Sequence, residues 1–389
     1  DYDITLFESK PYLGGHCYTH HIQESNKVLD IDMGLVLFNH QAYPNLLSLL
    51  KKFKVPYHKC DLSFSFYSKN LIKYKGPHLG NPFFQWKNLF STHSYSLFIE
   101  ILKFNHIAKK YLAQKHEEEK FGDFITKHDL PPLFMQGYLL PLMNTLWSCP
   151  WENLHELPCT FVLRYLLENS LLETFLSPTW YYVPNGAQAF TKPLSEDFRQ
   201  RIQLNTPINR IDRDKYHVTL HLKSGPEKFD AIILAVQADQ ALKMLSNPSP
   251  LELHILSTFE YSQRNVYLHT DKNLMPPDRK YWAALNYVDD HRRIMTYHAN
   301  KSQNFEAKLD YFITISEGQP VTPGKILMQT RLNRPRYTLD NVHNQKRYSE
   351  INGILNTYYA GSYWGYGTLE DAIQSAYQAC KPFQVAIPT

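Results

Sequence analysis

The sequence is poor in cysteine and has no long apolar run. The 389-residue chain contains five cysteines, an odd number, and none stands in Cys-x-x-Cys spacing. This composition argues against a disulfide framework or a zinc site and favours a reducing compartment. No apolar run reaches the ~18 residues that a membrane-spanning helix needs. We therefore predict no metal site and a cytoplasmic location.

The sequence also lacks a strong excess of charge of either sign. The net charge of +4 comes from 41 Lys and Arg against 37 Asp and Glu. It is too weak and too evenly spread to predict binding to nucleic acid. With 43% hydrophobic residues the chain can bury a large core and is expected to form two lobes. The 27 Tyr and 22 Phe suit a long apolar cavity, but they equally suit plain core packing.

The N-terminal stretch has the pattern of a nucleotide-binding strand. The apolar run Ile4–Phe7 favours a buried strand, and it ends in Glu8, whose carboxylate could accept both ribose hydroxyls of an adenosine. Gly14 and Gly15 would let the backbone approach a pyrophosphate. Because this acid normally lies about 20 residues beyond a glycine-rich phosphate loop, we expect the first strand and its loop to precede Asp1. A chance Gly-Gly in an ordinary turn is the alternative at this point.

Four segments, in the same order, resemble flavin-dependent amine oxidase-like proteins. The closest match is a bacterial-type branch described as predicted FAD/NAD(P)-binding oxidoreductases. The segments lie within Phe7–Gly34, Tyr138–Ser148, Phe229–Ala235 and Tyr358–Ala372. Together they extend the resemblance over nearly the whole chain, which a single chance turn cannot explain.

The resemblance implies an α/β fold with a Rossmann-like FAD/NAD(P)-binding domain, truncated at its N-terminus, and a mixed α+β substrate domain. The FAD-binding domain would comprise residues 1–60, 181–245 and 336–389. The substrate domain would comprise residues 61–180 and 246–335.

The resemblance also implies FAD as the cofactor, in an extended pose. Glu8 would bind the ribose, Gly34 would let the backbone lie beside the isoalloxazine, and Ile208 would pair with the adenine edge. The glycine-rich turn near the C-terminus opens a helix, whose free N–H groups attract oxygen-rich groups. The cofactor-binding residues would be Glu8, Gly14, Gly15, His16, Gly34, Ile208, Gly361, Gly367 and Glu370.

The sequence departs from the family pattern near the expected reaction centre. Ser362 follows Gly361 where many amine oxidases have an acid, and Thr368-Leu369 replaces an aromatic–His pair. No lysine matches the one that amine oxidases place, through water, on flavin N5. His269 and Asn286 either line the cavity or are satisfied polar residues within strands. We therefore name no catalytic base.

Two helical segments carry further predictions. The stretch 83–119 has amphipathic spacing with lysines nearby, so it could lie on a membrane surface or form a substrate-domain helix with a solvated face. Pro141 is expected to kink the helix 138–148, which frees backbone carbonyls and bends the wall of a cavity.

The predicted function is FAD-dependent oxidoreduction, with a hydride moving from an amine or lipid-like small molecule to the flavin. The alternative is a degenerate, non-catalytic relative that acts as a binding or interaction module. A nicotinamide-dependent dehydrogenase is disfavoured, because both the Gly14-Gly15 loop and the C-terminal glycine-rich turn fit a flavin better. Peripheral membrane contact and oligomeric state stay open.

Overall fold

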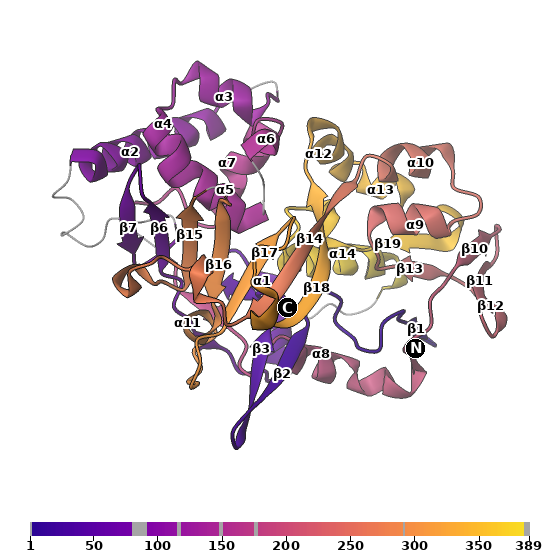
Figure 1. Ribbon diagram of the computed structural model, residues 1–389. Helices are drawn as coiled ribbons and strands as arrows, with labels where there is room; N and C mark the ends of the chain where they lie inside the picture. The colour runs from indigo at the N-terminus through magenta and orange to yellow at the C-terminus, as the bar shows by residue number, and fades with distance from the viewer. Residues whose placement is uncertain are drawn as a thin grey trace.

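The computed structural model describes residues 2–79, 92–114, 118–147, 151–174, 178–290 and 292–384. Helices α2 to α7 gather at one end of the molecule, above strands β6, β7 and β15 (Figure 1). Helices α9 and α10 and the meander β10–β12 lie at the other end. The largest sheet lies between these two groups of elements and connects them.

The central sheet has seven strands in the order β18-β14-β17-β16-β15-β6-β7. Neighbouring strands are antiparallel except β15 and β6, which are parallel. The bounds are β6 Phe64–Ser68, β7 Lys73–Gly76, β14 Glu260–His269, β15 Leu285–Asp289, β16 Ile294–His298, β17 Phe312–Ser316 and β18 Ile326–Arg336. Because side chains alternate along a strand, one face of this sheet packs into the main core and the other lies behind it.

The helical end covers the core face of the sheet. Its elements are α2 Thr92–Leu112, α3 Phe121–Lys127, α4 Pro132–Phe134, a π-helical turn Met135–Leu139, α5 Leu140–Trp147, α6 Trp151–Leu154 and α7 Cys159–Glu168. In α2 the residues Leu97, Ile101 and Phe104 share one face and are buried in the main core. This supports the second alternative for the segment, a substrate-domain helix with a solvated face. Its predicted start, Phe83–Ser91, and residues 115–117 lie outside the described residues.

Pro141 frees a backbone carbonyl, as the sequence predicted. A π-helical turn precedes α5, and Pro141 has no N–H to donate to the carbonyl of Gly137, four residues earlier. That carbonyl instead accepts the hydroxyl of Tyr74, a fully buried side chain on β7, at 2.7 Å. The freed carbonyl therefore ties the helix to the sheet beneath it.

The other end of the molecule holds two short parallel pairs and an antiparallel meander. β1 Leu6–Phe7 pairs with β9 Ile202–Gln203, and β13 Ile232–Leu234 pairs with β19 Thr357–Tyr359. The predicted N-terminal strand is present, although β1 is shorter than the run Ile4–Phe7. The remaining elements are β10 Arg210–Arg213, β11 Val218–Leu222, β12 Gly225–Phe229, α9 Ala238–Met244, α10 Pro250–Leu256, α12 Leu339–Gln345, α13 Tyr348–Ile351 and α14 Leu369–Cys380.

A buried ion pair fixes this second core. The Arg213 side chain is fully buried and donates to both oxygens of Glu252, at 2.7 and 2.9 Å. The Tyr359 hydroxyl donates to the same carboxylate at 2.5 Å. Because a buried charge is costly unless it is paired and hydrogen-bonded, these contacts hold β10, α10 and β19 in one arrangement.

Short elements connect the two ends. A hairpin of β2 Thr19–Glu24 and β3 Lys27–Asp32 projects from the molecule (Figure 1), and β8 Trp180–Tyr182 pairs with both β4 Leu37–Asn39 and β5 His58–Lys59. The helices here are α1 Pro44–Lys52, α8 Gln188–Ser195 and α11 Ala299–Ser302. Asn185 and Gly186 have positive φ, 63° and 78°, and form the turn between β8 and α8.

Candidate functional site

The Gly14-Gly15 loop has the backbone conformation that its glycines allow. Gly14 has φ 110° and Gly15 has φ 60°, both in the region that other residues rarely adopt. Gly15 and His16 are exposed, and their backbone N–H groups have no hydrogen-bond partner among the described residues. Two adjacent free donors at a left-handed turn form a concave site suited to an oxygen-rich anion.

Gly34 lies directly against this loop. A Cβ atom at Gly34 would come within 2.3 Å of the His16 carbonyl oxygen, so only glycine fits. The Asp32 carboxylate accepts the N–H groups of Gly34 and Val36, each at 2.8 Å, and so shapes the turn. The structure therefore brings two predicted contact segments, Gly14–His16 and Gly34, side by side.

Asp32 connects the Gly34 turn to Gln303. Its carboxyl is buried, and burial raises its pKa to about 6, although the two N–H groups that it accepts lower the pKa in part. Its backbone N–H donates to the Gln303 side chain at 2.8 Å, and its carbonyl accepts from the same side chain at 2.9 Å. The glycine turn is thus fixed in position from both sides.

His16 combines a desolvated ring with an exposed surface. Surrounding protein desolvates the ring and lowers its pKa to about 4, and the charges of Arg334 and Lys10 lower it further. The residue nevertheless keeps a surface open to solvent. His16 is therefore neutral at pH 7 and faces an open space.

Glu8 offers one free carboxylate oxygen at the end of β1. Its Oε1 accepts the Lys10 N–H at 2.8 Å and the Ser9 hydroxyl at 3.2 Å, which shapes the following turn. Its Oε2 has no hydrogen-bond partner in the part of the chain that the structure describes. One oxygen thus holds the turn, and the other remains available to a ligand hydroxyl.

Ile208 lies in the connection that returns to β1. The Thr206 N–H donates to the Glu8 carbonyl at 2.9 Å, which places this connection beside the end of β1. Ile208 follows two residues later, is half-buried and packs against the second core. The structure therefore brings Ile208 into the neighbourhood of Glu8, although 200 residues separate them in sequence.

The C-terminal glycine-rich turn joins β19 to α14. Gly361 has extended backbone, and its N–H donates to the Ser375 hydroxyl at 2.8 Å. Gly367 has φ 85°, and a Cβ atom there would come within 2.6 Å of the Tyr337 hydroxyl. Thr368 then caps α14 through a capping box with Asp371. Burial raises the pKa of Asp371 to about 6.

Glu370 has both carboxylate oxygens engaged within the protein. One oxygen accepts the Asn45 N–H at 2.9 Å and the Asn45 side chain at 2.7 Å, and the other accepts the Leu46 N–H at 3.0 Å. These donors are the first-turn groups of α1, which otherwise lack partners. What the structure shows for Glu370 is a structural contact between α14 and α1.

His269 and Asn286 lie on the face of the central sheet that points away from the main core. Leu268 is in the main core, so its neighbour His269 points to the other face, and Leu285 places Asn286 likewise. The His269 ring contacts the Thr314 hydroxyl at 2.8 Å and the Asp271 N–H at 3.1 Å, while Asn286 donates to the Ala283 carbonyl. Both are satisfied polar residues within strands.

An aromatic cluster lies between the helical end and the glycine-rich turn. Its ring centroids are 4.4 to 5.8 Å apart, and the Trp147 indole N–H donates to the Tyr366 carbonyl at 3.2 Å. The sequence indicated only an abundance of aromatics, because these positions share no local spacing. The members are Trp147, Phe161, Tyr165, Tyr337 and Tyr366.

Metal-ligand clusters are absent from the part of the chain that the structure describes. In those ranges, no three or more His, Cys, Asp or Glu side chains are grouped so that they could hold a metal ion. No helix in those ranges combines the length and apolar character needed to cross a bilayer.

The sequence matches the family model described as flavin containing amine oxidoreductase over residues 2–293. The chain belongs to this family. No curated protein matches the sequence. Membership confirms the predicted family and implies FAD as the cofactor.

Several solved structures share the fold at low sequence identity. Putrescine oxidase bound to putrescine has a TM-score of 0.71 at 11% identity, over 98% of this chain and 93% of that one. Cyclohexylamine oxidase from Brevibacterium oxydans has a TM-score of 0.68 at 12% identity, over 98% and 94%. A CLA-producing fatty acid isomerase from P. acnes has a TM-score of 0.67 at 15% identity, over 98% and 92%. The predicted α/β, amine oxidase-like architecture is confirmed.

The residues around the Gly14–His16 loop fit the flavin cofactor of this family. The free N–H groups of Gly15 and His16 suit the oxygens of a pyrophosphate or ribityl chain, and the free Glu8 oxygen suits a ribose hydroxyl. Because Gly34 has no Cβ, its backbone can pack against the His16 carbonyl and hold the loop in this conformation.

Proposed function

We propose that this family member binds FAD beside Glu8, the Gly14–His16 loop and Gly34. We further propose that it oxidises an amine or lipid-like small molecule. The observation that carries the proposal is the packing of Gly34 on His16 beside two free backbone donors. A glycine motif alone would be weak evidence for a cofactor site. Here the free N–H groups of Gly15 and His16 and the close packing of Gly34 on His16 occur in one loop, and Glu8 offers a free carboxylate oxygen.

The chain supplies position and shielding, whereas bound FAD would supply the acceptance of a hydride. Gly15 and His16 would bind through their N–H groups, and Glu8 would fix the adenosine end. The neutral His16 ring adds no positive charge to the cleft at pH 7. The aromatic cluster beside Tyr366 would exclude water from one side.

The names of the similar structures support both substrate classes. Putrescine oxidase and cyclohexylamine oxidase are named for amines, and the isomerase is named for a fatty acid. The alternative function, a non-catalytic binding module, is favoured by one observation. His269 and Asn286, the polar residues considered for the cavity, lie on the other face of the sheet with their own partners.

The test is the absorbance spectrum of the purified full-length protein, with FAD added if none is retained. We expect a flavin spectrum for the wild type and for Gly324→Ala, where a Cβ meets nothing within 4 Å. Gly34→Ala should lose the flavin, because its Cβ would collide with the His16 carbonyl. A colourless protein that FAD cannot reconstitute contradicts the proposal. Bound flavin that no amine or fatty acid reduces without oxygen supports the binding module instead.

A further inference from the structure

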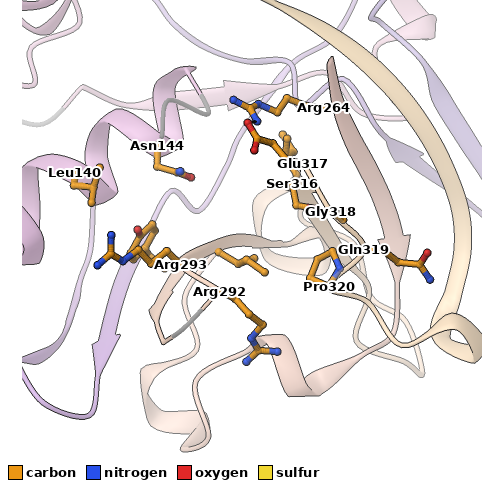
Figure 2. A pocket seen from close by; sticks show the side chains of 13 residues that line it. Leu140, Asn144, Arg264, Arg292, Arg293, Ser316, Glu317, Gly318, Gln319 and Pro320 are labelled. Carbon is orange, nitrogen blue, oxygen red and sulfur yellow. Dashed lines mark hydrogen bonds and ion pairs between the residues drawn. The ribbon is translucent and has the colours of Figure 1, made fainter. Parts of the chain in front are cut away.

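A cavity of about 430 Å³ lies between α5 and the ends of strands β15, β16 and β17. Its volume is within the range of small-molecule sites. Figure 2 shows Arg264 beside Glu317, with Arg292 and Arg293 on a separate segment and the Arg292 guanidinium directed away from Arg264. Apolar side chains, including Leu140 and Ile315, complete the wall. The cavity therefore combines guanidinium groups with an apolar surface.

Arg264 is a buried cation with a replaceable partner. Its side chain is 5% exposed, and its Nε atom is buried without a hydrogen-bond partner in the described structure. The one carboxylate paired with it, Glu317, is 69% exposed and sits where β17 ends. Because Glu317 is largely in solvent, another carboxylate can take its place on the guanidinium at little cost.

The other two arginines have partners outside the cavity wall. Arg292 donates through Nε to both oxygens of Asp290, at 3.0 and 3.2 Å, and Arg293 lies 3.8 Å from Asp289. Neither aspartate lines the cavity. Asp290 and Asp289 therefore offset much of the charge of Arg292 and Arg293. Arg264, whose carboxylate partner is largely in solvent, is the guanidinium group best placed to bind an organic anion.

The cavity lies close to the glycine-rich turn of the candidate flavin site. Asn144 on α5 lines the cavity, and Trp147 on the same helix donates to the Tyr366 carbonyl in that turn. Three residues of α-helix span about 4.5 Å along its axis. The cavity and the turn therefore contact α5 at positions less than one helical turn apart.

We propose that this cavity binds the carboxylate of an apolar acid, with Arg264 as the anchoring residue and Glu317 as the group displaced. The acid would be the substrate of the flavin site, so this inference rests on the proposed function and narrows its substrate class. Neutral Asn144 can donate to the same carboxylate.

The experiment measures binding of dodecanoate, below its micelle concentration, to the full-length protein by isothermal titration calorimetry. Dodecylamine has the same apolar body with the opposite charge. We expect dodecanoate to bind at least tenfold more tightly than dodecylamine. Arg264→Met should weaken dodecanoate at least tenfold. The control Arg331→Met should not change it, because Arg331 is exposed and pairs in the sheet opposite Asn265, on the other face from Arg264.

Glu317→Gln provides a second test that does not depend on removing the buried cation. It should raise the affinity for dodecanoate severalfold, because the competing carboxylate is gone. Unchanged or weaker binding in Glu317→Gln would overturn the inference, as would tighter binding of the amine than of the acid.

The substrate role has its own readout. In anaerobic reduction of bound flavin by the acid, Arg264→Met should raise the half-saturating concentration at least tenfold and leave the limiting rate within about twofold. Arg331→Met should match the wild type. Calorimetry with FAD-free protein separates the two proposals. Loss of flavin binding with dodecanoate binding intact contradicts only the proposed function, whereas retained flavin without preference for the acid contradicts only this inference.

Discussion

At the scale of single residues, the candidate site depends on atoms left without partners inside the protein. The candidate FAD site offers one free acceptor, the Oε2 of Glu8. It also offers two free donors, the N–H groups of Gly15 and His16. The sequence predicted these residues from a strand that ends in an acid and from a glycine pair. It could not show which of their atoms the protein itself uses, because those contacts depend on neighbours such as Lys10.

Glu8→Gln should weaken FAD binding roughly tenfold to a hundredfold, the effect of one hydrogen bond to a charged group. Glutamine keeps an oxygen for the Lys10 N–H, so the turn should persist. The measurement is the quenching of flavin fluorescence on titration. Glu196→Gln, at an exposed glutamate, is the control and should bind FAD normally. Equal affinity in the two variants would remove Glu8 from the site.

Asp32 makes stability depend on pH in a defined window. Its pKa rises from 3.8 when unfolded to about 6 when folded, so its stabilising contribution is full below about pH 4 and is lost as pH rises through 6. The change is about 3 kcal/mol in the free energy of unfolding. Asp32→Asn should lack this contribution, so the difference between variant and wild type should vary across pH 4 to 7 in urea denaturation. A difference that stays constant across this range would refute the assignment.

At the scale of elements, the sequence predicted local features of helices and turns better than the long-range contacts that stabilise them. The carbonyl freed by Pro141 follows from local chemistry and is confirmed. The positive φ of Asn185 and Gly186 likewise reflects residue types that tolerate this conformation. The partner of Glu370 could not be predicted in this way. Its carboxylate binds the start of α1, 325 residues earlier in the chain. A contact over that separation leaves no trace in local spacing.

The freed Gly137 carbonyl offers a test of the kinked helix. Tyr74→Phe should cost about 1–3 kcal/mol of unfolding free energy, because a buried acceptor loses its donor. Pro141→Ala restores an N–H four residues after Gly137, so Tyr74→Phe should cost less in that background. Urea denaturation of the four proteins measures the coupling. Tyr216→Phe, at a 70% exposed side chain, should be neutral. Equal costs in both backgrounds would show that the carbonyl does not depend on Tyr74.

At the scale of the whole molecule, the family and the α/β fold were predictable because four separated segments matched in order. The charged cavity was not predictable. Arg264 belongs to β14, Arg292 and Arg293 to the turn between β15 and β16, and Glu317 to the end of β17. Only the strand order brings these residues together.

FAD should stabilise the whole chain, because a ligand that binds only the folded state raises its unfolding free energy. At a concentration one hundred times the dissociation constant, the gain is about 2.7 kcal/mol. Thermal unfolding followed by tryptophan fluorescence should show a rise in Tm that grows with FAD concentration. NAD at the same concentration serves as the comparison. A shift with NAD and none with FAD would favour the nicotinamide alternative.

The contact between Gln303 and residue 32 has a consequence for how this protein can change over evolution. Gln303 binds the backbone N–H and carbonyl at position 32, not the aspartate side chain. A substitution at position 32 therefore leaves the contact intact and calls for no matching change at position 303. Selection can retain Gln303 while residue 32 changes. The contact between Gln303 and the backbone of residue 32 would then produce no correlated substitutions at these two positions in descendants of the gene.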